Sequence, residues 1–457
     1  MRKGRNHFQI PQNPSTAFAA SMPRSLPSTG AITGLGEALA FFRDPAFAQE
    51  RFATHGDVFE TSLLGQRLIF IRGDAAIGDL FRQGDAVEGW WPESVRRLLG
   101  SRSLANRNGE AHKARRRVVG QLFSNAALQR YSPAIVQQVN ALAQELGSTS
   151  EPLALADRMR RFAFAVIAST VLGLDDPDRD ALFVDFEIWT KALFSVPIAL
   201  PGSPFAKALA ARGRLLERLK QVLNSADGSR GGLDLIRGGL DEAGIPLSDD
   251  DLVEQLLLLL FAGYETTASS LSCLMRELLL QPELDTWLRS ETSALTWPPT
   301  AEEATTAFDV SRAPSLNALV QEVMRMTPPV GGFFRRTTRA ITLADVEIPA
   351  DRVIQVALAA SNRHGSGDLD VFRPSRHLDD NPGGPTLMPF GGGERVCLGK
   401  ALAELEIRLM VVGLLQQVEL QLSPNQDLSL QLIPSPSPRD GLEVQALTPS
   451  STPQRNH

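Results

Sequence analysis

The chain has 457 residues, of which 43% are hydrophobic and 21% are charged, and its net charge is −6 at pH 7. These values are typical of a globular protein, and the negative charge does not favour a nucleic-acid partner. The two cysteines, Cys273 and Cys397, are too few for a disulfide framework and fit a reducing compartment. The basic start lacks the ~20 apolar residues of a membrane anchor, so we expect a soluble, cytoplasmic protein with no transmembrane anchor.

The composition does not divide the chain into separate units. We therefore expect one domain over residues 31–447. Prolines interrupt residues 1–30, which predicts a flexible leader, and residues 448–457 predict a disordered tail. Residues 37–42 and 45–55 have the apolar spacing of helices.

Two β-rich runs, residues 58–63 and 67–71, flank a short glycine-containing turn, which predicts a β-hairpin. Residues 87–108 show no periodicity and predict a long loop. In that loop Trp90 and Trp91 either line an apolar pocket or cover the edge of the core, and the sequence does not separate these alternatives.

A basic helix opens at His112. His112 and Arg116 are one turn apart and share a face, which is either a solvated basic surface or a clamp for an anion. Arg115 and Arg117 are expected to face solvent or a negatively charged redox partner. The helical pattern that follows is interrupted by the apolar, proline-rich residues 194–204, which we expect near a substrate entrance.

The longest helical run spans Asp249–Leu280, with Ser248 as its N-cap. It is apolar on all sides but too often interrupted by charges to span a membrane, so we expect a buried central helix. Gly263 permits a local widening of this helix. The simplest interpretations are that Thr266 bonds back to the backbone and that Glu265 forms a surface ion pair, but buried polar groups also occur where chemistry takes place.

After this helix, Glu322 and Arg325 lie one turn apart on another helical run, a spacing that is common in surface ion pairs. Strands are expected around residues 341–348 and 353–358.

Cys397 follows three consecutive glycines and directly precedes a helical run. The backbone N–H groups and the positive dipole end at a helix start favour a thiolate, and Arg395 adds a nearby positive charge. A cysteine nucleophile needs a histidine base and zinc needs about four ligands, and neither set is present nearby. Haem iron needs only one protein ligand, and a thiolate is a known choice.

The chain is identified by its motifs as resembling the cytochrome P-450 superfamily. The haem-ligand loop of that superfamily, F-x-x-G-x-R-x-C-x-G, is matched by Phe390, Gly393, Arg395, Cys397 and Gly399. The oxygen-binding helix pattern A-G-x-E-T-T is matched by Ala262 to Thr267, and E-x-x-R falls between the two motifs. Within the superfamily the chain looks most like the bacterial and animal retinoic-acid hydroxylases, although Tyr264 replaces a histidine that is common there and Phe333 replaces a smaller residue.

The resemblance implies a mainly α fold with a small β region, and haem b between the long central helix and the cysteine loop. By resemblance, the iron ligand is Cys397, and the other cofactor-binding residues are His112, Arg116, Arg335, Arg395, Phe390, Gly391 and Ala262. Thr266 and Glu265 would relay protons during oxygen activation. The expected substrate-binding residues are Val330, Gly331, Phe333, Phe261 and Trp90, and the expected structural network is Glu322, Arg325 and Arg376.

The function implied is a monooxygenase that hydroxylates an apolar small molecule, such as a retinoid- or isoprenoid-like acid or a sterol-like compound. It would use O₂ and two electrons from a separate ferredoxin- or flavodoxin-type donor. The alternatives are a haem-thiolate peroxygenase, isomerase or dehydratase that does not use O₂, and a non-catalytic haem protein. Glu265 and Thr266 favour the monooxygenase, because relatives of the second kind often lack this acid and alcohol pair.

Overall fold

The computed structural model describes residues 24–30, 34–44, 46–63, 65–225, 231–306, 313–378 and 386–447. The predicted tail and residues 1–23 of the predicted leader lie outside this part of the chain. Within residues 24–30, Arg24 pairs with Val346 and Ser28 pairs with Glu60 through isolated β-bridges. Contacts with the strands therefore begin before residue 31, at which the sequence placed the start of the domain.

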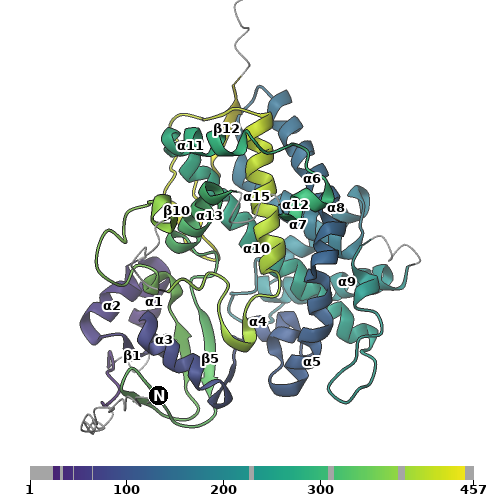
Figure 1. The fold of residues 1–457 in the computed structure, drawn as a ribbon. Helices are drawn as coiled ribbons and strands as arrows, with labels where there is room; N and C mark the ends of the chain where they lie inside the picture. The colour runs from purple at the N-terminus through teal and green to yellow at the C-terminus, as the bar shows by residue number, and fades with distance from the viewer. Residues whose placement is uncertain are drawn as a thin grey trace, which may run out of the picture.

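The fold is mainly helical with a small β region, as predicted (Figure 1). The helices are α1 (Leu35–Arg43), α2 (Phe47–His55), α3 (Gly73–Arg82), α4 (Glu93–Leu99), α5 (Gly109–Gly120), α6 (Asn125–Ser148), α7 (Leu155–Ile167), α8 (Asp176–Thr190), α9 (Pro204–Asn224), α10 (Asp249–Leu280), α11 (Pro282–Thr292), α12 (Ala301–Thr306), α13 (Pro314–Met326), α14 (Leu358–Ser361) and α15 (Lys400–Gln417). The strands are β1 (Val58–Leu63), β2 (Gln66–Ile71), β3 (Val87–Gly89), β4 (Leu153–Ala154), β5 (Phe333–Thr337), β6 (Ile341–Leu343), β7 (Val346–Ile348), β8 (Val353–Val356), β9 (Leu420–Leu422), β10 (Leu430–Gln431), β11 (Ser437–Pro438) and β12 (Glu443–Ala446).

The main sheet has the strand order β1-β2-β8-β5-β3. The predicted hairpin is confirmed as β1 and β2, which pair antiparallel, while β2 and β8 pair in parallel. Side chains alternate across β2, because successive residues of a strand point to opposite faces. Ile69 and Ile71 join one apolar cluster with Ile77 of α3, whereas Phe70 joins another with Phe47 of α2. Figure 1 shows this sheet and α1–α3 on one side of the molecule and α5–α9 on the other.

The long central helix α10 has the predicted bounds. Ser248 caps it by accepting a hydrogen bond from the backbone N–H of Asp251 at 3.2 Å, and Pro282 follows its end. The helix is long and apolar enough to cross a membrane, but 67% of its most apolar window is buried inside the protein. It packs closely against α7, α9 and α15 and therefore has the role of a core helix.

The prediction of a long loop over residues 87–108 is wrong. This segment contains β3, which extends the main sheet beside β5, and the seven-residue helix α4. Val95, Leu98 and Leu99 of α4 are buried in the main core. The helix was missed because two turns are too short to establish a period in the sequence.

Candidate functional site

Cys397 lies on a tight loop between Met388 and the start of α15. Its backbone N–H donates a hydrogen bond to the carbonyl oxygen of Phe390 at 2.9 Å, which closes the loop. Gly391 and Gly393 have φ angles of +70° and +65°, a region that side chains rarely adopt. The loop therefore depends on glycine at these two positions.

The Cys397 thiol is exposed on one side and crowded by protein on the others. Burial raises its pKa above the ordinary value, while the backbone N–H groups of Gly399 and Lys400 and the charge of Arg116 act in the opposite direction. The donors predicted at the helix start are thus present, but the prediction that the loop favours the thiolate is wrong for the protein alone, because burial outweighs them. A cation bound on the exposed side would reverse this balance, since a metal-bound thiol is deprotonated.

Four basic side chains converge beside this loop, and we call them the cation cluster: His112 and Arg116 of α5, Arg335 of β5, and Arg395. His112 is buried, and burial together with the charges of Arg395, Arg116 and Arg335 lowers its pKa to about 4. Burial and Arg395 lower the pKa of Arg335 to about 10. His112 is therefore neutral at pH 7 among three guanidinium groups.

The three arginines of the cation cluster bond mainly to backbone oxygens. Arg116 donates to the carbonyl of Val396 at 2.6 Å, and Arg335 donates to the carbonyl of Phe334 at 2.8 Å. Arg395 donates to the backbone of Arg107 and to the side chain of Asn108. Within the described part of the chain none of the three forms an ion pair with a carboxylate, and Glu394 and Glu88 act on Arg395 only from a greater distance.

One face of α10 is less buried than the rest of this helix. Ala262 is exposed, and Phe261 and Thr266 are half-buried. The hydroxyl of Thr266 donates a hydrogen bond to the carbonyl of Ala262 at 2.6 Å, which is the back-bonding interaction considered from the sequence. This face therefore presents a small, partly polar surface from a helix that is otherwise buried.

The helix is not widened at Gly263. Regular α-helical geometry continues through this residue, and the π-helical segment of this region is instead Ala168–Leu172, directly after α7. A Cβ atom at Gly263 would lie 3.4 Å from the side chain of Ile167. The glycine thus allows α7 to pack closely against α10.

Glu265 and Tyr264 point toward α7 and α8. Burial raises the pKa of Glu265, Arg160 acts in the opposite direction, and Glu187 raises it further. The buried Tyr264 donates a hydrogen bond to Glu187 at 3.4 Å, and its ring lies 5.1 Å from that of Phe186. Within the described residues no hydrogen bond joins Glu265 to Thr266, so any transfer between the two needs an intervening group.

The family of this chain is given by comparison with known proteins. The family model described as Cytochrome P450 matches residues 23–442 of this chain. The chain belongs to the cytochrome P450 family. Members of this family are haem b monooxygenases, and this chain is such an enzyme.

The relatives of this P450 agree with the predicted branch. Cytochrome P450 120 of Synechocystis sp. is 33% identical over 431 residues, which are 92% of this chain and 96% of that protein. Cytochrome P450 26C1 of Homo sapiens is 30% identical and covers 88% of this chain and 85% of its own. A solved structure described as retinoic acid bound cyanobacterial CYP120A1 has a TM-score of 0.84 at 33% identity, over 93% of this chain and 100% of that one.

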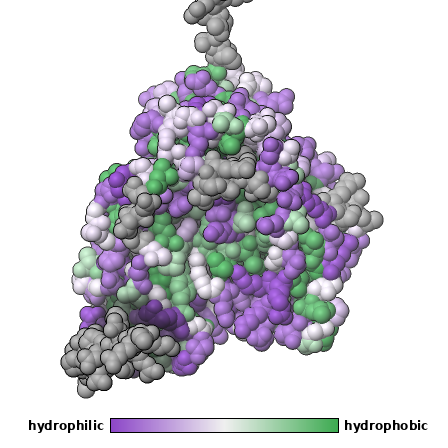
Figure 2. All heavy atoms as spheres, in the orientation of Figure 1, coloured by the Kyte–Doolittle hydropathy of each residue, from purple (hydrophilic) through white to green (hydrophobic). Residues whose placement is uncertain are grey.

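The residues present in this P450 fit a haem. A thiol is exposed on a glycine-rich loop, and within the described residues no carboxylate forms an ion pair with the three arginines beside it. Haem has one iron that accepts a thiolate and two propionate groups that need positive charge. Figure 2 shows apolar side chains gathered in the middle of the face that carries α15, with hydrophilic ones over α5.

The predicted structural residues Glu322, Arg325 and Arg376, together with His377, form what we call the ion-pair network. Glu322 is 0% exposed and accepts hydrogen bonds from Arg325 at 2.8 and 2.9 Å and from Arg376 at 3.1 Å. Burial alone raises the pKa of Glu322, but Arg325, His377 and the backbone N–H of Arg373 lower it to about 2. The sequence did not identify His377, whose position directly after Arg376 is the only signal for it.

Arg115 was expected to face solvent or a redox partner, and this prediction is wrong. Its side chain is 5% exposed and forms ion pairs with Asp251 at 2.6 Å and with Glu242 at 2.7 Å. It joins α5 to the first turn of α10. Arg117, two residues later on the opposite face, is exposed.

The residues predicted to bind substrate lie in different surroundings. Trp90 and Trp91 line a pocket of about 430 Å³, and Trp90 also packs edge-on against Phe334 with ring centres 5.4 Å apart. Val330 and Gly331 are exposed. Phe333 instead stacks on Phe81 at 6.2 Å and lies beneath the guanidinium of Arg335, so it lies next to the cation cluster.

Sequence reasoning also missed Glu406 of α15. This carboxyl is 2% exposed, and burial raises its pKa well above the ordinary value although Thr267 hydrogen-bonds to it. Its Oε2 atom has no partner within the described structure. The sequence signal that could have identified Glu406 is a glutamate on the apolar side of a helical run.

Proposed function

We propose that this P450 hydroxylates an apolar small molecule that carries an acid group, of the retinoid or isoprenoid class. The observation that supports the cofactor chemistry is the exposed Cys397 thiol beside three arginines that form no ion pair with a carboxylate in the described part of the chain. The substrate class is supported by similarity to a protein whose structure is described as retinoic acid bound.

In this proposal Cys397 is the iron ligand, and the cation cluster holds the propionates. Phe390 and Gly391 shape the loop around Cys397. Ala262 of α10 would border the haem from the side opposite this loop. When bound, the haem supplies the activation of O₂ and the hydroxylation of a C–H bond. The protein supplies the binding, the orientation and the delivery of protons.

Proton delivery is assigned to Thr266 and Glu265. The Thr266 hydroxyl donates its hydrogen to the Ala262 carbonyl, so its oxygen is held in one position and can accept a hydrogen bond from water. Because burial raises the pKa of Glu265, this carboxyl holds a proton closer to neutral pH than an exposed glutamate does. Glu265 points away from Thr266, so we propose water between them.

The apolar substrate would contact Phe261, Val330 and Gly331, with Trp90 lining the neighbouring pocket and Phe333 supporting Arg335 from below. Two electrons would come from a ferredoxin- or flavodoxin-type protein, with Arg117 as a contact for an acidic donor. A cytoplasmic location is part of the proposal, and it is compatible with α10, the one helix of the described residues that is long and apolar enough to cross a membrane, being mostly buried inside the protein.

The first test is the reduced, CO-bound difference spectrum of the purified protein beside a Cys397→Ser variant. A long-wavelength thiolate-type band in the wild type, lost in the variant, supports the ligand assignment. Retinoic acid and its alcohol, retinol, are then compared by the spin-state shift each produces. A short-wavelength band alone in folded, haem-replete wild type would contradict the proposal.

A Thr266→Ala variant separates this function from the peroxygenase, isomerase and dehydratase alternatives. For a monooxygenase we expect the variant to keep consuming electrons from the donor, while product formation falls and hydrogen peroxide accumulates. An enzyme that does not activate O₂ would show no such uncoupling, and a non-catalytic haem protein would show no turnover at all.

A further inference from the structure

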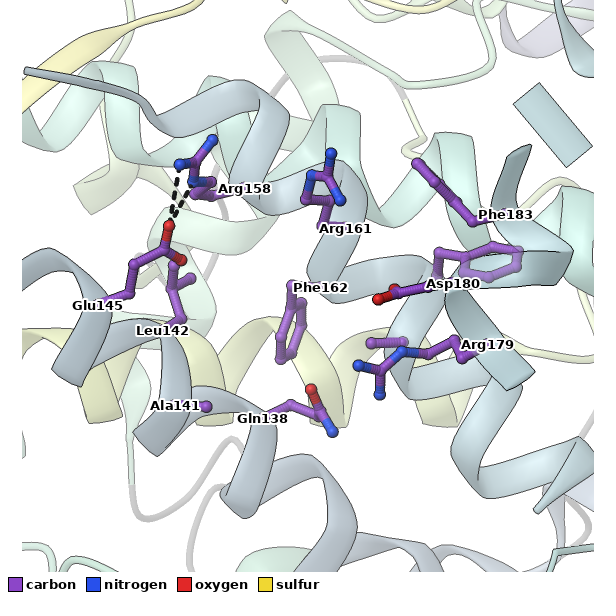
Figure 3. A pocket seen from close by; sticks show the side chains of 12 residues that line it. Gln138, Ala141, Leu142, Glu145, Arg158, Arg161, Phe162, Arg179, Asp180 and Phe183 are labelled. Carbon is purple, nitrogen blue, oxygen red and sulfur yellow. Dashed lines mark hydrogen bonds and ion pairs between the residues drawn. The ribbon is translucent and has the colours of Figure 1, made fainter. Parts of the chain in front are cut away.

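A second pocket lies on the outer surface between α6, α7 and α8 (Figure 3). Its volume is about 200 Å³. None of its lining residues belongs to α10, β5 or the cysteine loop, so it is separate from the proposed haem and substrate site. The proposed function assigns it no role.

Three arginines reach this pocket, and two of them are paired with acids. Arg158 forms an ion pair with Glu145 at 2.9 Å, and Arg179 forms one with Asp176 at 2.8 Å. Figure 3 shows the Arg158 pair along the pocket wall. Within the described part of the chain Arg161 has no ion pair, and its guanidinium lies 5.6 Å from the ring centre of Phe183.

The rest of the wall combines apolar rings with one opposing charge. Phe162, Phe164 and Phe183 supply an aromatic surface beside the arginines. Asp180 also lines the pocket and has no ion pair within the described residues, so it would repel an anion to some degree. Counting side chains gives three positive and two negative groups, because the lining acids are Glu145 and Asp180.

The aromatic wall is shared with the central helix. The ring of Phe164 lies 6.2 Å from that of Tyr264 and the ring of Phe183 lies 6.0 Å from it. Tyr264 precedes Glu265, the residue proposed to carry protons. A molecule seated against Phe164 and Phe183 would therefore be one layer of rings away from α10.

We propose that this pocket binds a small aromatic carboxylate, which regulates the enzyme through α10. The carboxylate pairs with Arg161, and the ring of the ligand packs against Phe162 and Phe183. The volume of the pocket limits the size of the ligand, since pockets for drug-sized ligands occupy about 300–1,000 Å³ and this one is smaller. A benzoate-sized molecule fits this limit, whereas the long chain of a retinoid does not.

The experiment titrates the holoenzyme with benzoate and observes binding by ligand-detected NMR, with imidazole occupying the haem pocket. Benzylamine and benzamide are the cationic and neutral probes of similar shape. We expect benzoate alone to bind. In Arg161→Gln we expect about tenfold weaker binding, because one charge-assisted hydrogen bond is lost.

Two further variants make this result specific. Asp180→Asn should strengthen benzoate binding severalfold, because it removes the opposing charge. Arg439→Gln, which changes an exposed arginine outside the pocket, should leave binding unchanged. Binding of benzylamine in place of benzoate, no binding of benzoate at millimolar concentration, or equal binding to wild type and Arg161→Gln would each overturn the proposal.

The regulatory part is tested by the substrate concentration that gives half the spin-state shift, measured with and without saturating benzoate. We expect a change of about fivefold in wild type and a clearly smaller change in Arg161→Gln at the same benzoate concentration, because the variant is only partly occupied. Binding that depends on Arg161 but leaves this midpoint unchanged would overturn the link to α10. Because the NMR experiment does not require turnover, its result is independent of the proposed hydroxylation.

Discussion

The ion-pair network and the cation cluster are built from the same residue types but differ in how their charges are balanced. In the network, Glu322 lies between Arg325 and Arg376 at hydrogen-bonding distance, and Asp368 pairs with Arg376 at 3.1 Å. In the cluster, three arginines approach a histidine, and no carboxylate of the described residues forms an ion pair with them. The buried charges of the ion-pair network are therefore paired within the protein alone, whereas those of the cation cluster are not.

This difference separates a structural from a functional use of buried charge. Burying a charge is costly unless it is paired, so the chain makes this pairing where it only needs stability. In the cation cluster the free-energy cost of burying charge is not offset by pairing, as the lowered pKa values of His112 and Arg335 indicate. An anionic ligand recovers that free energy when it binds, which is a property of a binding site.

Glu322→Gln should have the largest effect on stability, because it removes the central carboxylate of the ion-pair network. We expect a loss of about 3–5 kcal/mol in the free energy of unfolding, because Arg325 and Arg376 remain buried with their central partner uncharged. The loss is measured by denaturant-induced unfolding. Glu110→Gln, which removes an exposed partner of Lys113, is the control and should have no measurable effect. A similar small effect for Glu322→Gln would show that the network is not a major source of stability.

Acid should affect the two regions in different pH ranges. The folded pKa of Glu322 is about 2, below its ordinary value of 4.5, so its contribution is present above pH 4.5 and is lost as pH falls toward 2. The folded pKa of His112 is about 4, below its ordinary 6.5, so its contribution is lost earlier, as pH falls from 6.5 to 4. Each shift corresponds to about 3 kcal/mol.

Urea unfolding of the haem-free protein at a series of pH values checks this order. His112→Gln should remove the loss of stability between pH 6.5 and 4 and leave the loss below pH 4.5. An unchanged profile in His112→Gln would contradict the assignment. Haem binding should narrow the pH range over which His112 lowers stability, because propionates favour the protonated imidazole and so raise its pKa.

Arg335→Met should have opposite effects on two measurements. Haem affinity is expected to fall about 10- to 100-fold through the loss of a charge-assisted contact. The haem-free protein should be as stable as wild type or more stable by about 1 kcal/mol, because one of the mutually repelling charges is gone. Haem transfer to apomyoglobin and urea unfolding give the two values. Arg336→Met, which alters the exposed neighbour paired with Asp351, should change neither.

The smallest effect is expected for Arg117→Gln. Arg117 is exposed, so the free energy of unfolding should change by less than about 0.5 kcal/mol. Reduction by an acidic electron donor should slow, most clearly at low ionic strength. Arg115→Gln, on the buried side of the same helix, should instead lower stability clearly. Equal stability of the two variants would contradict the burial difference between them.

The features that depend on local chemistry could be predicted from the sequence. The glycine-rich cysteine loop, the bounds of α10 with its Ser248 cap, the β1–β2 hairpin and the motif residues Glu322 and Arg325 all follow from turn residues, capping residues or short periods. Within them the geometry is set by residues a few positions apart, which a single sequence shows directly.

Tertiary structure decided how distant residues meet. Arg115 is buried because it meets Asp251, 136 positions away, and His377 joins Glu322 across 55 positions. The packing of α7 and α8 against α10 directs Tyr264 and Glu265 away from Thr266. Whether a charge is paired or unpaired depends on such long-range neighbours, and so does the net effect of burial on the Cys397 thiol.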